Sequence, residues 1–163
     1  MLVILAALTA MSDRARSAPE DVAIIKRMID QIQNASPTKR LEGTGFTEKQ
    51  FAANTLTYFI MNMHPLEREA LDPDTIDDIA ALLSNQDHYV RYAAAAALGF
   101  IGAPAKRVVP ALLQALKEAR SRRPSVSTGI GIEDVIVSRL IEWNVCTPRP
   151  VIIFDHACDY LLR

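Results

Sequence analysis

The chain has 163 residues, of which 50% are hydrophobic and 23% are charged, and this length and balance suit one folded domain rather than two. The formal net charge is −1 at pH 7, so no global field draws the protein toward nucleic acid or a membrane surface. The two cysteines, Cys146 and Cys158, could form one bridge or stay as free thiols, but they exclude a disulfide framework.

An apolar run, Leu2–Met11, opens the chain and is too short to span a bilayer. It resembles the apolar core of a signal peptide, but it lacks a basic lead-in and a good cleavage motif. Three interpretations stay open: a signal sequence, a true start at Met11, or a first helix packed on the domain. We therefore expect an apolar segment over residues 1–16 and a single helical-repeat domain over residues 17–163. The expected compartment is the cytoplasm, with export as the alternative if the apolar run belongs to a signal peptide.

Two capping boxes predict the first two helices. The first is Ser17-Ala-Pro-Glu20, and an amphipathic stripe follows it over residues 25–32. A polar loop is expected over residues 36–45. The second box is Thr47-Glu-Lys-Gln50, where Phe46 and Phe51 hold the two positions of a hydrophobic staple, and its helix is expected to end before Pro65.

Further helices follow in close succession. Acidic residues from Asp72 onward suit the start of one helix, residues 85–88 form a tight turn, and an alanine-rich helix runs from about Tyr89 to Phe100. We expect that helix to close at Gly99 or Gly102. Beyond it, the pattern predicts a helix over 108–119 with Pro110 in its first turn, a loop over 121–131, a helix over 132–143, a break over 146–150 and a last helix over 151–162. Strand-like alternation is nearly absent, so the fold class is all-α.

The alanine-rich helix carries apolar residues on every face. A helix of this kind is buried on several sides, which in a small domain places it in the middle of a stack. The sequence also repeats, because Ile79-Ala-Ala-Leu-Leu83 aligns with Val109-Pro-Ala-Leu-Leu113 thirty positions later. A repeat of this length is typical of a solenoid of antiparallel helix pairs.

On these residues, together with Asp87 in the turn, Val90-Arg91 after it and Ala97-Leu98-Gly99, the chain resembles the HEAT-repeat family, including its short phycobilisome-lyase-type variety. The resemblance covers residues 75–119. It implies a short HEAT-like α-solenoid with degenerate repeats on both sides. It also implies that Asp87 and Arg91 tie successive repeats together.

Catalytic and metal-binding patterns are missing from the sequence. There is no Gly-rich phosphate loop, nucleophile elbow or pair of metal-spaced histidines, and the Cys and His spacing near the C-terminus fits no zinc pattern. His88 beside Asp87 could be oriented for acid–base work, but polar residues are common in repeat turns. We therefore expect no catalytic residue, no metal and no cofactor.

Charge is distributed unevenly along the chain. Residues 67–87 carry seven acids against Arg68 alone, and residues 106–123 carry six bases against Glu118 alone. Both stretches could be solvated faces or a surface that a partner recognises by charge. The basic candidates for an anionic partner are Lys106, Arg107, Lys117, Arg120, Arg122 and Arg123. Nucleic acid is the less favoured partner, because no aromatic residues are interleaved with these bases.

The expected function is binding of another protein through a stacked-helix surface, as an adaptor, an inhibitor or an immunity protein against a bacterial toxin. The expected contact residues surround the start of the alanine-rich helix, where tyrosine and arginine are typical interface anchors: Asp87, His88, Tyr89, Arg91 and Tyr92. The alternatives are an enzyme or enzyme accessory, because short HEAT-like repeats also resemble bilin lyases, and a nucleic-acid binder that uses the basic helix.

Overall fold

A computed structural model describes residues 18–121 and 131–146 of the protein. Throughout these ranges the chain folds into helices, and the β pairing is limited to one isolated bridge between Arg40 and Thr47. The predicted all-α class is confirmed. The elements are α2 (Ala18–Asn34), α3 (Glu48–Asn62), α4 (Pro65–Glu69), α5 (Pro73–Ala81), η1 (Leu82–Ser84), α6 (His88–Ile101), η2 (Ala103–Val108), α7 (Val109–Ser121) and α8 (Ile132–Glu142).

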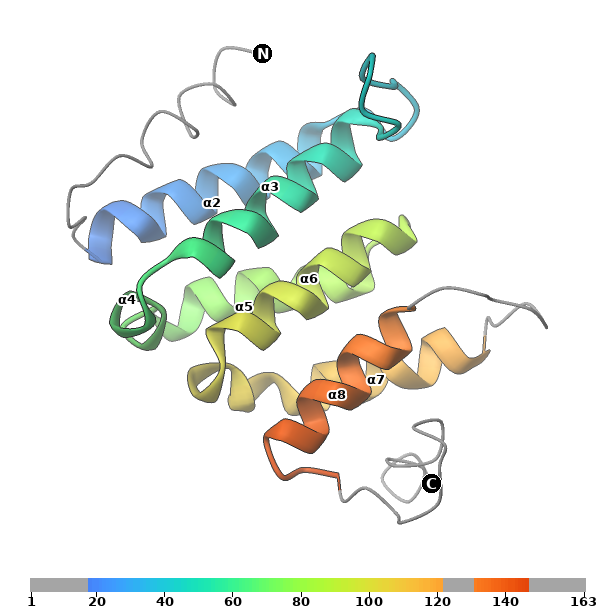
Figure 1. Cartoon of the computed structure of the whole chain (residues 1–163). Helices are drawn as coiled ribbons and strands as arrows, with labels where there is room; N and C mark the ends of the chain where they lie inside the picture. Colours follow the sequence, from blue (N-terminus) through green and yellow to red (C-terminus); the bar gives the residue numbers. More distant parts are fainter. Residues whose placement is uncertain (1–17, 122–130, 147–163) are drawn as a thin grey trace.

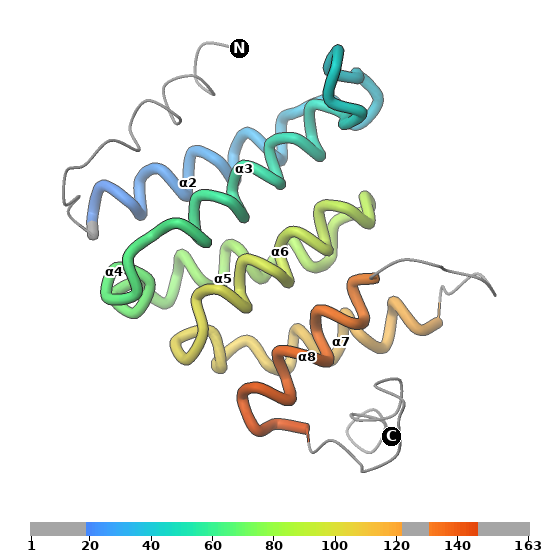
Figure 2. Tube along the Cα trace, viewed as in Figure 1, coloured from blue at the N-terminus to red at the C-terminus, as the bar shows by residue number. Residues whose placement is uncertain are grey.

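The helices form two layers (Figure 1). We name α2, α5 and α7 the A layer, and α3, α6 and α8 the B layer. Each A helix is followed by an antiparallel B helix, so the described residues contain the pairs α2/α3, α5/α6 and α7/α8. The chain passes from pair to pair in one direction (Figure 2). The result is a short solenoid, as predicted, and the helices on both sides of the recognisable repeat take part in it.

The alanine-rich helix α6 occupies the centre of the stack. It packs against α3 on one side, α8 on the other and α5 in the A layer. Its buried residues are mostly small: Val90, Ala93, Ala94, Ala95, Ala97, Leu98, Gly99 and Ile101. The prediction of a helix enclosed by neighbouring layers is confirmed. Alanine serves this position because it combines high helix propensity with close approach of the neighbouring helices.

Side-chain caps begin α3 and α5 where the sequence predicted them, while Ser17 of the other predicted capping box lies outside the described residues. Thr47 and Gln50 form a complete capping box at α3, with bonds of 3.3 and 3.2 Å to each other's backbone N–H. Asp72 caps α5 by accepting the N–H of Thr75 at 2.9 Å and its hydroxyl at 2.7 Å. Burial disfavours the charged form of Asp72, but the two bonds from Thr75 outweigh it and lower its pKa.

Several boundaries differ from the prediction. Of the two predicted ends of the alanine-rich helix, Gly99 lies inside α6 and Gly102 is confirmed as its C-cap, with a φ of 82° that is accessible to glycine without strain. The short helices α4 and η2 were not predicted, because five or six residues give too little periodicity to register. Pro110 is the second residue of α7, in the first turn as predicted. Proline is tolerated there because a backbone N–H at that position would have no acceptor within the helix. Residues 122–130 of the predicted loop over 121–131, and all of the predicted last helix over 151–162, lie outside the described residues.

Candidate functional site

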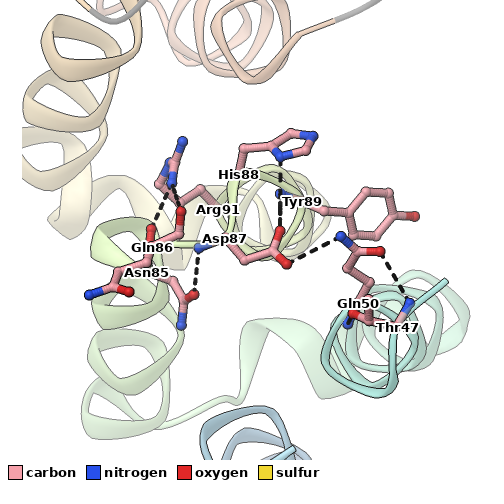
Figure 3. Close-up of polar contacts among 8 residues, drawn as sticks. All are labelled: Thr47, Gln50, Asn85, Gln86, Asp87, His88, Tyr89 and Arg91. Carbon is pink, nitrogen blue, oxygen red and sulfur yellow. Dashed lines mark hydrogen bonds and ion pairs between the residues drawn. The ribbon is translucent and has the colours of Figure 1, made fainter. Parts of the chain in front are cut away.

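The turn before α6 is organised by Asp87 (Figure 3). Its carboxylate Oδ1 accepts the N–H of Tyr89 at 2.8 Å and so caps the helix, while its own N–H donates to Asn85 Oδ1 at 3.0 Å. The second oxygen, Oδ2, accepts the side-chain amide of Gln50 at 3.2 Å. Gln50 is also the residue that closes the capping box of α3 with Thr47. One chain of hydrogen bonds therefore joins the N-termini of two successive B helices.

Arg91 holds the same turn from the other side. Its Nη1 donates to the backbone carbonyls of Asn85 at 2.7 Å and Gln86 at 2.9 Å (Figure 3). Asp87 and Arg91 are thus part of the framework, and Asp87 connects successive repeats as the family resemblance implies. Substituting either residue would therefore disturb the turn itself, in addition to any effect on the binding of a partner protein.

His88 lies at the exposed edge of this framework, with its ring above Asp87 (Figure 3). Its side chain is 81% exposed, and its Nδ1 lies 4.0 Å from Asp87 Oδ1, beyond hydrogen-bonding distance. Both oxygens of Asp87 already accept other hydrogens. The pair therefore lacks the geometry of an oriented imidazole and carboxylate that acid–base catalysis uses.

Tyr89 and Tyr92 begin an aromatic surface. The ring of Tyr89 lies against Phe46, with centroids 5.1 Å apart, and 6.1 Å from the ring of Tyr92. Its hydroxyl donates to Asn54 Oδ1 on α3 at 3.4 Å. Burial raises the pKa of Tyr89, and the neighbouring Tyr92 adds to the effect. The phenol therefore remains neutral at physiological pH, and its single hydrogen is the one donated to Asn54.

The register between α3 and α6 extends this surface. The hydrogen bonds Gln50–Asp87, Asn54–Tyr89 and Thr57–Ala93 join residues 37, 35 and 36 positions apart, so the two helices run side by side in step. Next to them on the outer side of α3 are Tyr58, 48% exposed, and Met61, 40% exposed. Sequence analysis missed both, although their spacing from Asn54, at i+4 and i+7, marks one helix face.

We name this surface the tyrosine face. On α6 its members recur at helical spacing and are all half-buried. None of its members carries a charge. It comprises Asn54, Tyr58 and Met61 on α3 and Tyr89, Tyr92, Ala96 and Phe100 on α6.

Arg139 of α8 marks the charged border of the tyrosine face. Its guanidinium lies 5.6 Å from the ring centroid of Phe100, in a cation–π arrangement, and bonds Glu142 Oε2 at 2.6 Å. The side chain crosses α6 at Gly99, where an added Cβ would lie 2.6 Å from Arg139 Cδ. Gly99 is therefore needed for close approach of α8 rather than for ending a helix.

Four of the six basic residues predicted to meet an anionic partner fall within the described part of the chain. Lys106 and Arg107 lie in η2, whereas Lys117 and Arg120 lie in α7. Because α7 starts at Val109 and rises about 1.5 Å per residue, Lys117 lies roughly 12 Å along its axis. Arg122 and Arg123 lie outside the described residues.

Arg107 is engaged within the A layer. Its Nη2 bonds Asp77 Oδ2 at 3.1 Å, across a separation of thirty residues. This contact joins the acidic and basic stretches of the sequence. The thirty-residue spacing found in the sequence therefore brings corresponding parts of successive A-layer helices together.

Within the two described ranges, no three His, Cys, Asp or Glu side chains are grouped so that they could hold a metal ion. Cys146 is disulfide-bonded, which decides between the bridge and the free thiol left open by the sequence. Cys158, the other cysteine of the chain, lies beyond the described part. A search of the described helices for one long and apolar enough to cross a membrane found none.

Comparison with known proteins identifies the repeat. Residues 49–126 match the family model described as HEAT repeats. The match is wider than the 75–119 stretch that carries the resemblance in the sequence, and it takes in α3 and all of α7. No curated protein and no solved structure gave a significant match to the chain.

Proposed function

Residues 49–126 form a HEAT-repeat segment, and on that premise we propose that the protein is a non-catalytic interaction module that binds another protein through the tyrosine face. HEAT repeats build extended surfaces from stacked helices, and such surfaces serve interaction and scaffolding. The module would act as an adaptor or as an inhibitor-type binder of its partner.

The observation that carries the proposal is the composition of the tyrosine face. Among the described residues, the large exposed hydrophobic side chains are Tyr58, Met61 and Leu66, and the first two belong to this face. Tyr89 and Tyr92 stand beside them on α6. Tyrosine and methionine are enriched at protein interfaces, whereas the outer side of a helix that only faces water is normally charged.

The face is also pre-organised. Tyr89 is fixed by Phe46 and by the hydroxyl bond to Asn54, so little side-chain entropy remains to be lost when a partner binds. Behind it, the bond from Gln50 to Asp87 holds α3 and α6 in register. Within the contact set expected from the sequence, we place Tyr89, Tyr92 and His88 on the partner side and Asp87 and Arg91 in the support of the face.

The test uses substitutions on the face against matched substitutions elsewhere. The tagged wild type, the double variant Tyr58→Ala/Tyr92→Ala and the control Lys117→Ala, an exposed A-layer position, are used for affinity capture from the source cell. We expect a protein retained by the wild type and the control and lost by the double variant. Circular dichroism confirms that all three remain folded.

Site-specific crosslinking then locates the contact. A photoreactive phenylalanine analogue placed at Met61 should crosslink to the captured protein, whereas the same group placed at Lys26, exposed on α2, should not. Crosslinks at both positions, or capture that survives the double variant, would overturn the proposed face. Retention of nucleic acid or a pigment in place of a protein would overturn the function.

A further inference from the structure

Aromatic rings line one end of the tyrosine face. Phe46, Tyr89 and Tyr92 follow one another with ring centroids 5.1 and 6.1 Å apart, and the ring planes are tilted at 52° and 35°. Phe100 continues the aromatic surface further along α6, about 16 Å from Tyr89 along the helix axis. Rings of this kind offer a ligand flat apolar contact area.

The polar groups of the tyrosine face are hydrogen-bond donors that await an acceptor. Asn54 Oδ1 accepts the hydroxyl of Tyr89, which leaves both N–H bonds of the exposed Asn54 amide. Neither this amide nor the hydroxyls of Tyr58 and Tyr92 donate to any group in the part of the chain that the structure describes. A ligand of this face should therefore bring acceptors.

The charges at the border of the tyrosine face are already matched within the protein. Arg139 and Glu142 of α8 bond each other at 2.6 Å, and the guanidinium also lies over the ring of Phe100. A charged ligand group placed on the face would lose water without gaining an opposite charge. The ligand that complements this surface electrostatically is therefore uncharged.

A proline-rich segment in the polyproline II conformation has these properties. Its backbone makes no internal hydrogen bonds, so its carbonyls are free to accept, and proline has no N–H that needs an acceptor. Its rings are apolar and dock on surfaces lined by aromatic side chains. We propose that the tyrosine face binds an uncharged, proline-rich segment of the partner protein in this conformation. The proposal rests on the proposed function, which places the partner on this face.

The length of the face agrees with such a segment. Five residues in the polyproline II conformation, at about 3.1 Å each, extend over the same distance of about 16 Å that separates Tyr89 from Phe100 along α6. The segment is also stiff before it binds, so little chain entropy is lost. A small surface can therefore bind it.

An amphipathic helix complements the tyrosine face less well. Its backbone carbonyls already accept hydrogen bonds within the helix. Covering the face with the apolar side of a helix would remove water from Asn54, Tyr58 and Tyr92 and supply no acceptor, which destabilises the complex. The free donors thus favour an extended ligand over a helical one.

The ligand class is tested by the binding of labelled peptides to the full chain, measured by fluorescence anisotropy. The probe is a fluorescein-labelled peptide of ten prolines. The controls are a glycine–serine peptide of the same length and an amphipathic helical peptide. We expect the proline peptide to bind with a Kd below about 1 mM and more tightly than either control. No binding at that concentration, or binding no tighter than that of a control, would overturn the proposal.

Substitutions on the face locate the bound peptide. Tyr92→Phe keeps the ring and removes the hydroxyl, so it should weaken binding of the proline peptide about fivefold, as loss of one hydrogen bond does. Tyr92→Ala also removes the ring and should weaken binding more than about tenfold. Lys117→Ala, on the A layer, should leave Kd unchanged. Circular dichroism confirms that the variants are folded, and equal binding by the wild type and Tyr92→Ala would contradict the proposal.

Charged peptides test the neutrality of the face. The fifth proline of the peptide is replaced by aspartate in one version and by lysine in another. Both versions should bind more weakly than the parent peptide, because neither charge finds an unmatched opposite charge on the face. Tighter binding of either version would contradict the proposed match.

This inference and the proposed function fail in different ways. If the proline peptide does not bind, while Tyr58→Ala/Tyr92→Ala still abolishes capture of a protein, the face is an interaction surface whose ligand is not proline-rich. If capture survives that double variant, the proposed function itself fails.

Discussion

The side-chain amide of Gln50 donates to Asp87 Oδ2 at 3.2 Å, so the residue that completes the cap of α3 also anchors the residue that caps α6. The start of α6 is thereby supported by the B helix before it. The contact forms only when α3 and α6 are both in place. Asp87 therefore helps to order two successive repeats.

We expect Asp87→Ala to destabilise the protein by about 1–2 kcal/mol, because it removes the cap of α6 and the link to Gln50. Gln50→Ala should cost less, about 1 kcal/mol. The double variant should be more stable than the sum of the single losses implies, by about 0.5 kcal/mol or more. Urea unfolding of the four proteins measures this coupling, and strict additivity would mean that the contact contributes nothing.

Gly99→Ala should have opposite effects in two backgrounds. In the wild type, the new Cβ meets the side chain of Arg139, so Arg139 must leave Phe100 and Glu142, and we expect a loss of about 1 kcal/mol. In an Arg139→Ala background the obstacle is gone, and the better helix propensity of alanine should stabilise α6 by up to about 1 kcal/mol. Thermal unfolding of the four variants reveals the change of sign. A stabilising effect in both backgrounds would show that Arg139 moves aside at no cost.

Asp72 predicts a defined dependence of stability on pH. Its pKa is lowered in the folded state, so its charged form contributes stability above its unfolded pKa of about 4, and this contribution is lost as the pH falls through the folded pKa. Asp72→Asn keeps a capping side chain but cannot ionise. The wild type should be the more stable protein at pH 7, and the difference should shrink below about pH 4. Denaturant titrations at several pH values measure it, with the exposed Asp74→Asn as a control.

Binding through the tyrosine face should depend little on salt, because the face carries no charged side chain. Once the partner is purified, we expect Kd to change less than about threefold between 50 and 300 mM salt, and Lys117→Glu to have little effect. Tyr92→Ala should weaken binding by about 1–2 kcal/mol, roughly 5- to 30-fold in Kd. A steep decrease of affinity with salt would instead direct attention to the bases on η2 and α7.

The features that the sequence predicted are local ones. Thr47, Gln50 and Asp72 act within one helical turn, so their residue types and spacing suffice to identify the caps. The burial of α6 was predictable for a related reason, because a helix without a polar side has to be enclosed. The repeat was recognisable from two matching pentapeptides and the turn that lies between them.

The features that the sequence did not reveal depend on contacts between repeats. In the sequence, Gly99 is a plausible helix end. In the structure it lies inside the helix, and the side chain of Arg139 from the next helix pair packs over it. Tyr58 and Met61 resembled ordinary helix residues, because their exposure depends on how far α6 covers α3. Arg91 was predicted both as a contact residue and as a structural residue between repeats, and its bonds go to the carbonyls of Asn85 and Gln86 within the turn. Contacts between residues of different helices leave no recognisable pattern in the sequence of either helix alone.

The small residues of α6 also determine the shape of the molecule. Where α6 meets its B-layer neighbours, Thr57 of α3 bonds the carbonyl of Ala93 and Arg139 of α8 lies over Gly99, whereas the A layer buries large side chains such as Ile79 and Leu112. Helices separated by alanine and glycine approach more closely than helices separated by isoleucine and leucine. Each pair is therefore a wedge that is narrower on the B side. Additional repeats of the same kind would bend into an arc, with the tyrosine face along its inner curve.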